Sequence, residues 1–144
     1  MREVKTSLEI DAPADAVWRQ LVDKARWRRF SDFCDKDPAH PIAEGRTFTF
    51  GLRLLGLPPI PIDAHVIRLV PDRELRWVGK MPGFRGEHYF LLEPDGSGNT
   101  RLVHGEQFSG PLGELYDVLF HTVSVHTYAT FNVGLAMQVE RQRF

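Results

Sequence analysis

Three residues that can transfer protons, His88, His104 and Glu106, are predicted to point to the same side of a β-sheet. Residues 86–92 and 100–108 both have strand character, and alternate residues of a strand point to the same face. The residues that share this face with them are apolar: Phe90, Leu92, Leu102 and Phe108. Two imidazoles and a carboxylate beside an apolar wall can orient a ligand hydroxyl or carbonyl, or act as a general acid–base pair.

A structural explanation of the same residues is that Glu106 and a histidine satisfy each other's hydrogen bonds inside the core. A metal site is a further alternative, because His104 and Glu106 have the i, i+2 spacing of two ligands on one strand face. The sequence offers no identified third ligand and no His-x-His pair beside them, so we expect neither a metal nor a cofactor. Ligand contact, structural pairing, and catalysis by Glu106, His104 or His88 stay open at this level.

The elements that must position these residues begin with a strand and two short helices. Apolar and polar residues alternate over residues 4–10, which is typical of a half-buried strand. Pro13 suits the first position of a helix. An apolar stripe with helical spacing follows it, formed by Val17, Trp18, Leu21 and Val22. Trp27, Phe30 and Phe33 recur every three residues and predict a second short helix or a tight helical turn.

Four or five further strand patterns follow at near-regular spacing, separated by turns rich in proline and glycine, which indicates an antiparallel meander. They cover residues 46–54, residues 62–70, a short stretch from Leu75 that stops near Pro82, residues 86–92 and residues 100–108. In 62–70 both faces are apolar, so the pattern does not decide whether Asp63 and His65 point inward. The loop 54–60 is unusually apolar, which suits a lid over a pocket, a dimer contact or an edge that touches a membrane.

The tail of the chain, residues 112–144, is expected to form one long helix. No proline follows Pro111, and apolar residues recur close to the helical period. The stripe comprises Leu112, Leu115, Leu119, Val123, Thr127, Phe131 and Leu135. The β-branched residues of 122–133 also fit a strand. We expect a helix because the apolar spacing persists on both sides of that stretch and no cluster of turn residues interrupts it.

Size and composition fit one soluble globular domain over residues 1–144. The 18 basic and 19 acidic residues give a net charge of −1, unlike the strong basic field of nucleic-acid-binding proteins. The single cysteine, Cys34, excludes an intramolecular disulfide. The N-terminus has no apolar signal core, and no apolar stretch approaches the ~20 residues of a membrane span. We therefore expect a cytoplasmic protein without stable membrane insertion.

The order of elements, a strand, two short helices, a meander and a long C-terminal helix, is that of the α+β helix-grip fold. Three segments resemble the START/Bet v 1-like (SRPBCC) superfamily, and especially its bacterial polyketide cyclase/dehydrase and lipid-transport members. They are IDAPADAVW at 10–18, PGFRGEHYF at 82–90 and GNTRLVHGEQFSG at 98–110. The resemblance extends over nearly the whole chain, and it is specific for the fold rather than for a function.

The resemblance implies a deep cavity between the concave face of the sheet and the long helix. Members of the superfamily bind sterols, lipids, aromatic polyketides, plant hormones or quinone-like molecules. We therefore expect this chain to bind a small hydrophobic or aromatic molecule. The residues expected to contact it are Phe48, Phe50, Trp77, His88, Phe90, Leu102, His104, Glu106, Phe108, Tyr116, Phe120 and Phe131.

Two other functions agree with the same resemblance. One is a polyketide cyclase, aromatase or dehydratase that uses a histidine or Glu106 as its acid or base. The other is a protein-interaction module similar to the heat-shock co-chaperone branch of the superfamily, which predicts a filled or collapsed cavity and a binding surface outside it. A small hydrophobic ligand is the partner we expect, with no nucleic acid, and a homodimer also agrees with the sequence.

Overall fold

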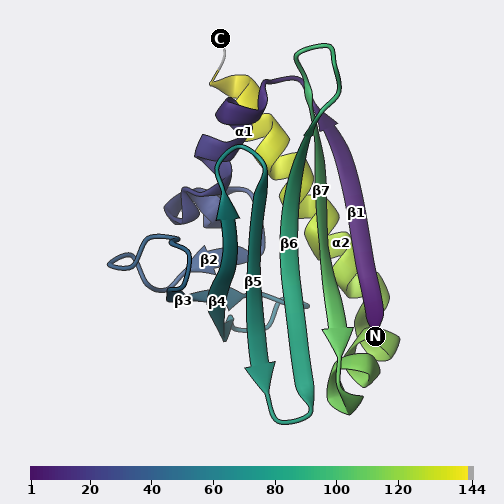
Figure 1. Cartoon of the computed structure of the whole chain (residues 1–144). Helices are drawn as coiled ribbons and strands as arrows, with labels where there is room; N and C mark the ends of the chain where they lie inside the picture. Colours follow the sequence, from purple (N-terminus) through teal and green to yellow (C-terminus); the bar gives the residue numbers. More distant parts are fainter. Residues whose placement is uncertain (143–144) are drawn as a thin grey trace.

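The computed structural model describes residues 1–142 as a curved antiparallel sheet that wraps around a long helix (Figure 1). The strands are β1 (Arg2–Ile10), β2 (Phe33–Asp35), β3 (Thr47–Leu52), β4 (Ile60–Val70), β5 (Glu74–Met81), β6 (Phe84–Pro94) and β7 (Thr100–Ser109). They form one seven-stranded sheet in the order β1-β7-β6-β5-β4-β3-β2, so the last strand lies beside the first. Strand β1, which precedes the two short helices, thus pairs antiparallel with β7, the strand that precedes the long helix.

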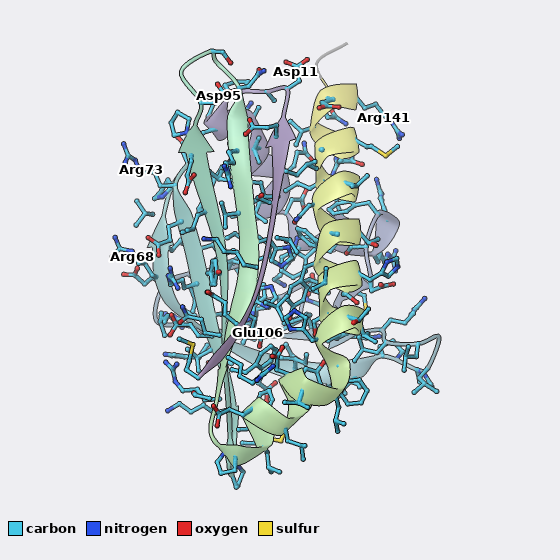
Figure 2. The ribbon with its side chains drawn as sticks, turned by 90° about the vertical axis from the view of Figure 1, so that its right-hand side faces the viewer. Asp11, Arg68, Arg73, Asp95, Glu106 and Arg141 are labelled. Atoms are coloured by element: carbon cyan, nitrogen blue, oxygen red, sulfur yellow. The ribbon has the colours of Figure 1, made fainter. Side chains whose placement is uncertain are left out.

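The helices are α1 (Ala14–Leu21), the 3-10 helix η1 (Lys24–Arg29) and α2 (Pro111–Arg141). Helix α2 crosses one face of the sheet and contacts β1, β7 and β6. Side chains fill most of the space between the helix and the sheet (Figure 2). The expected arrangement, α+β with a long C-terminal helix held by a curved sheet, is confirmed.

The core is centred on Trp27 of η1, which is fully buried. Its ring lies 5.9–6.0 Å from five other aromatic rings, measured between centroids: Phe33, Phe48, Phe50, Trp77 and Phe131. The indole nitrogen of Trp27 donates to the carbonyl of Leu21 at 2.9 Å, so the polar edge of this ring is also satisfied. Helix η1 therefore fills one end of the space under the sheet.

The region after α1 differs from expectation in one respect. Trp27 lies in a short helix as predicted, but η1 ends at Arg29 and Phe33 begins strand β2. Strand β2 is short and pairs with β3, with Phe33 opposite Leu52. The recurrence of an aromatic residue every three positions suggested that the helix continues to Phe33. All three side chains pack in or against the core, but Phe33 does so from a strand.

Strand β4 resolves the ambiguity over Asp63 and His65. Ala64 and Val66 are buried, whereas Asp63 and His65 are exposed on the outer face. The strand also begins at Ile60, so that Pro61 lies inside it. Proline is tolerated there because β5 pairs with β4 only from His65 onward, and the preceding residues have a neighbour on one side only.

Helix α2 is bent at Phe120, whose φ of −122° and ψ of 17° are not helical. The expected helix is confirmed over Pro111–Arg141, and the last two residues of its expected range, 143–144, lie outside the described residues. Its expected apolar stripe is wrong before the bend. Leu112, Leu115 and Leu119 are each at least half exposed. The residues that are buried along the helix include Gly113, Asp117, Ser124, Tyr128, Phe131, Asn132 and Leu135. The inward face thus contains polar residues, which an apolar-stripe analysis passes over.

The bend turns the first part of α2 beneath the end of the sheet (Figure 2). Ion pairs hold this part to β1, since Arg2 Nε lies 2.7 Å from the buried carboxylate of Asp117 and the N-terminal amine lies 2.8 Å from Glu114. Gly110 precedes the helix with a φ of 81°, in the left-handed region that favours glycine. A Cβ at that position would also overlap the backbone carbonyl of Gly83.

Candidate functional site

A cavity of about 540 Å³ lies between the sheet and the first part of α2. Apolar and aromatic side chains make up most of its wall. They are Phe33, Phe50, Leu52, Leu54, Ile60, Pro61, Ile62, Trp77, Met81, Phe84, Phe108, Leu112, Tyr116 and Tyr128. The remaining lining residues are Asp63, Gly79, Lys80, Gly86, His88 and Glu106. A space of this size and character is typical of sites for small organic molecules.

Two glycines that face each other across two strands lie in the wall of this cavity. Gly79 of β5 and Gly86 of β6 are directly opposite each other in the sheet, and both line the cavity. The next cross-strand pair on the same face of the sheet is Trp77 and His88, whose rings stack at 4.7 Å with an interplanar angle of 9°. On this face of the sheet, the packed core therefore ends at the stacked rings of Trp77 and His88, and the cavity begins at the two glycines, which have no side chains.

A cluster of hydrogen-bonded polar side chains lies at this boundary. His88 and Glu106 are opposite each other on β6 and β7, and His88 Nδ1 lies 3.0 Å from Glu106 Oε1. The hydroxyl of Tyr128, on α2, donates to the same oxygen. Figure 2 shows Glu106 between the sheet and the helix. The sheet and the helix therefore both contribute to the position of this carboxylate.

The cluster continues away from the cavity into the core. His88 Nε2 lies 2.7 Å from His104 Nε2, and His104 Nδ1 lies 2.8 Å from Asn132 Oδ1. The amide nitrogen of Asn132 donates to Thr6 Oγ1 at 2.8 Å, and this hydroxyl donates to the backbone carbonyl of His104 at 2.7 Å. The contacts just described give both ring nitrogens of His104, the side-chain amide of Asn132 and the hydroxyl of Thr6 a hydrogen-bond partner, so the cluster also contributes to the stability of the fold.

Burial sets the charge state of two members of the cluster. It lowers the pKa of His104 well below its usual range, and the neighbouring imidazole of His88 acts in the same direction. Burial also raises the pKa of Tyr128 well above its ordinary value, with the carboxylate of Glu106 adding to the effect. At neutral pH His104 is therefore uncharged, and Tyr128 keeps the proton that it donates to Glu106.

The structure brings together the three polar residues that the sequence singled out. Of the twelve residues expected to contact a ligand, six line the cavity: Phe50, Trp77, His88, Glu106, Phe108 and Tyr116. Four of the others lie in the packed core beneath it, and they are Phe48, Phe90, Leu102 and Phe131. His104 is completely buried behind His88, and the ring of Phe120 lies 5.1 Å from that of Tyr116 without lining the cavity.

Three members of the cluster were not singled out by sequence: Thr6, Tyr128 and Asn132. Tyr128 and Asn132 are one helical turn apart, and both lie on the buried face of α2. A search for polar residues at i, i+4 spacing within the apolar tail would have found this pair. Its partners on β6 and β7 depend on tertiary packing, which the spacing does not contain.

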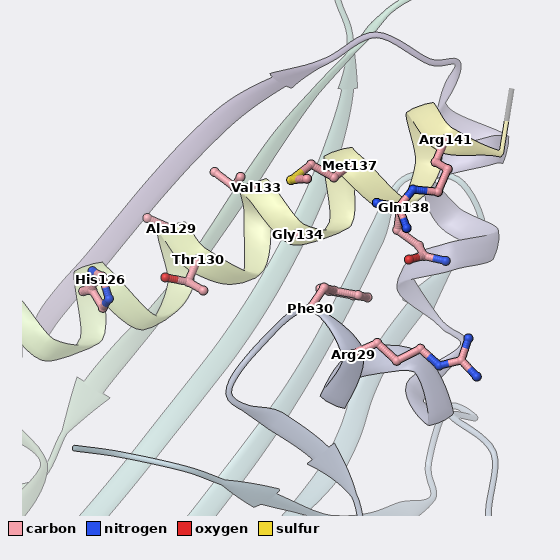
Figure 3. A pocket seen from close by; sticks show the side chains of 10 residues that line it. All are labelled: Arg29, Phe30, His126, Ala129, Thr130, Val133, Gly134, Met137, Gln138 and Arg141. Carbon is pink, nitrogen blue, oxygen red and sulfur yellow. The ribbon is translucent and has the colours of Figure 1, made fainter. Parts of the chain in front are cut away.

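A second hollow, of about 600 Å³, lies where η1 faces the later part of α2 (Figure 3). Gly134 permits this approach, because a Cβ there would overlap the carbonyl of Phe30. Arg29, His126 and Arg141 stand around its apolar floor (Figure 3). None of the twelve residues expected to contact a ligand lines this groove.

Two kinds of feature are missing from the described part of the chain. Within residues 1–142, no group of three His, Cys, Asp or Glu side chains is placed to hold a metal ion. No helix within the same residues is both long and apolar enough to cross a membrane.

Solved structures with this architecture are numerous. The Zhui aromatase/cyclase from Streptomyces sp. R1128 has a TM-score of 0.77 at 16% identity, with 99% of this chain and 96% of that chain covered. Protein Ms6760 from Mycobacterium smegmatis also has a TM-score of 0.77, at 9% identity, with 97% and 92% covered. A norcoclaurine synthase from Thalictrum flavum has a TM-score of 0.71 at 11% identity, with 99% and 96% covered.

These structural likenesses, at such low identity, establish the fold alone. No curated protein matches the sequence. The family model described as "Polyketide cyclase / dehydrase and lipid transport" matches residues 1–132, which include β1, the glycine pair and the whole polar cluster. The chain therefore belongs to the polyketide cyclase/dehydrase and lipid-transport family, whose Bet v 1-like helix-grip fold it shares.

Proposed function

We propose that this protein binds a small hydrophobic or aromatic molecule, such as a lipid, a polyketide or a quinone-like compound, in the cavity beside Glu106. The observation that carries the proposal is an apolar cavity of about 540 Å³ with one hydrogen-bonded polar cluster in its wall. Apolar burial at roughly 25 cal/mol per Å² supplies affinity, and the few polar groups supply orientation. Family membership supports the same role.

Native mass spectrometry of gently purified protein, followed by organic extraction, tests this proposal. A bound lipid, quinone or aromatic compound at one molecule per chain is the expected result. A protein that emerges empty, and that also binds no apolar probe in solution, would contradict the proposal.

The variant Gly79→Leu locates the bound molecule. A Cβ at Gly79 meets only the Asp63 carbonyl and a methyl group of Ile62, both at 3.8 Å, so a side chain here extends into open space. We expect Gly79→Leu to fold and to lose the ligand. Lys5→Leu is the matched control, since it adds leucine to the exposed face of β1. Retention of the ligand by Gly79→Leu would place the site elsewhere, such as the groove between η1 and α2.

The second candidate function is a cyclase, aromatase or dehydratase reaction. The pair formed by His88 and Glu106 favours it, because an imidazole and a carboxylate 3.0 Å apart at a cavity wall can exchange a proton with a bound carbonyl compound. With a linear polyketide thioester as the probe, Glu106→Gln should abolish turnover and leave binding nearly intact. Equal turnover by both proteins would exclude Glu106 as the acid or base.

The co-chaperone-like alternative has less support. It predicts a filled or collapsed cavity, whereas Gly79 and Gly86 leave an open one. We therefore rank it below the two functions that use the cavity.

A further inference from the structure

The directions of the hydrogen bonds in the polar cluster can be assigned by starting from Thr6, the last member of the cluster on the side away from the cavity. The backbone carbonyl of His104 can only accept, so the Thr6 hydroxyl donates its single proton there. Thr6 Oγ1 must then accept from the amide nitrogen of Asn132, which turns Asn132 Oδ1 toward His104 Nδ1. The opposite amide orientation would leave the contact between Asn132 and Thr6 without a proton. His104 therefore carries its hydrogen on Nδ1.

The position of the hydrogen on His104 determines the hydrogen-bond directions from His104 through His88 to Glu106. His104 is neutral, so its Nε2 holds a lone pair and accepts from His88 Nε2. His88 Nδ1 and Glu106 Oε1 are 3.0 Å apart and share one proton, because two lone pairs would repel each other. Tyr128 donates to the same oxygen, and two donors on one oxygen favour an imidazolium beside a carboxylate.

The second oxygen of this carboxylate, Oε2, is left for the cavity. No group within residues 1–142 donates a hydrogen bond to it, and it lies against Gly86 in the cavity wall. Both ring nitrogens of His88 are already engaged. Of the other charged residues in the lining, Lys80 is exposed, and the side chain of Asp63 lies on the outer face of β4, where it accepts from the hydroxyl of Thr49. The inner wall therefore presents the carboxylate oxygen Oε2 as an acceptor, and the imidazole beside it is already engaged.

We propose that the cavity selects an apolar molecule carrying a neutral hydrogen-bond donor, a phenolic or alcoholic hydroxyl, which donates to Oε2 of Glu106. This inference rests on the proposed binding function and deepens it by naming the ligand class. A carboxylate ligand would place a second negative charge against Glu106. A purely apolar ligand would bury Oε2 without a partner, and unpaired buried polar groups are costly. A hydroxyl avoids both penalties.

Three probes with the same ring system test this selection: 2-naphthol, 2-methylnaphthalene and 2-naphthoate, measured by equilibrium dialysis at pH 7. We expect 2-naphthol to bind roughly tenfold more tightly than 2-methylnaphthalene, as a hydrogen bond to a charged acceptor provides. We expect 2-naphthoate to bind most weakly of the three.

Two variants remove the acceptor in different ways. Glu106→Met replaces the carboxylate with an unbranched apolar chain and should reduce the preference for 2-naphthol to about one. Gly86→Ala keeps the carboxylate but displaces it, since the added Cβ would overlap Oε2. It should reduce the preference in the same way, even if Glu106→Met does not fold. Gln107→Met, on the other face of β7, is the matched control and should leave the preference intact.

The outcomes separate this inference from the function on which it rests. Equal affinity for all three probes, or tightest binding of 2-naphthoate, would overturn selection of a donor and leave apolar binding in place. A preference for 2-naphthol that survives both Glu106→Met and Gly86→Ala would overturn the role of Oε2. Failure of every probe to bind the unaltered protein would overturn both proposals.

Discussion

The two ends of the space between the sheet and α2 are built differently. At the end near η1, Trp27 is surrounded by five aromatic rings and is fully buried. At the other end, the inward positions of β5 and β6 are the paired glycines 79 and 86, and the space stays open. The same two strands thus supply a packed core at one end and a cavity at the other.

The difference shows how this fold separates stability from binding. The close-packed rings at the η1 end form a fully buried part of the core that stabilises the chain. At the open end, wall residues such as Leu112 and Met81 are exposed, so we expect their substitution to disturb the core less. The polar cluster from Glu106 to Thr6 lies across the boundary, and it is anchored in the packed end by His104 and Asn132.

The largest expected contrast comes from truncating one apolar side chain at each end. Phe131→Ala, in the packed core, should lower the free energy of unfolding by about 3–5 kcal/mol, since it leaves a buried void. Leu112→Ala, in the wall of the cavity and half exposed, should cost less than about 1 kcal/mol. Urea denaturation measures both values. Similar costs at the two ends would mean that the cavity end is as important to stability as the core.

A smaller contrast is expected between two tyrosines that donate to glutamates on opposite faces of the sheet. Tyr128 donates to Glu106 inside, and Tyr89 donates to the exposed Glu3 outside at 2.7 Å. Tyr128→Phe should lower the free energy of unfolding by about 1.5 kcal/mol, because a buried side chain loses its hydrogen bond to a carboxylate. Tyr89→Phe should cost less than about 0.5 kcal/mol, because water can hydrate Glu3. Chemical denaturation of the two variants in parallel checks the order, and a reversed order would refute it.

The smallest effect concerns the charge of His104. Its pKa is lowered in the folded protein, so the unfolded chain takes up a proton near pH 6.5 while the folded chain does not. Stability should therefore fall as the pH falls, by about 1 kcal/mol from pH 7 to pH 5.5 for this group alone.

Comparison with the variant His104→Gln separates the contribution of His104 from that of the other titrating residues. These include His88 of β6, which contacts His104, and Glu106 of β7, which contacts His88. The slope of unfolding free energy against pH should be shallower in His104→Gln by the stated amount. Identical slopes in both proteins would show that folding does not lower the pKa of His104.

Much of the fold could be predicted from the sequence because its signals are local. Alternation marked the strands, Pro13 marked the start of α1, and the proline-free tail marked α2. Strand β2 was missed because three residues are too few for a periodic pattern. The buried face of α2 was misplaced because Asp117, Ser124 and Asn132 are buried there as partners of other elements, and polar residues do not contribute to an apolar stripe.

The candidate site was predicted in part for the same reason. Strand alternation is a strict period of two, so it correctly placed His88, His104 and Glu106 on one face. It did not distinguish a residue that lines a cavity from one that lies beneath it. Phe50 and Phe90 have equally apolar patterns, yet Phe50 reaches the cavity and Phe90 is covered by His88 and His104.

By itself, the sequence determined the types of most elements, their order in the helix-grip fold and the common face of His88, His104 and Glu106, because each depends on spacing along one segment. Only the tertiary structure decided that Tyr128 and Asn132 complete the cluster, that Gly79 and Gly86 meet across two strands, and that Oε2 of Glu106 lies against Gly86. These features depend on register and on the bend of α2, and both are set by packing between segments that are distant in the chain.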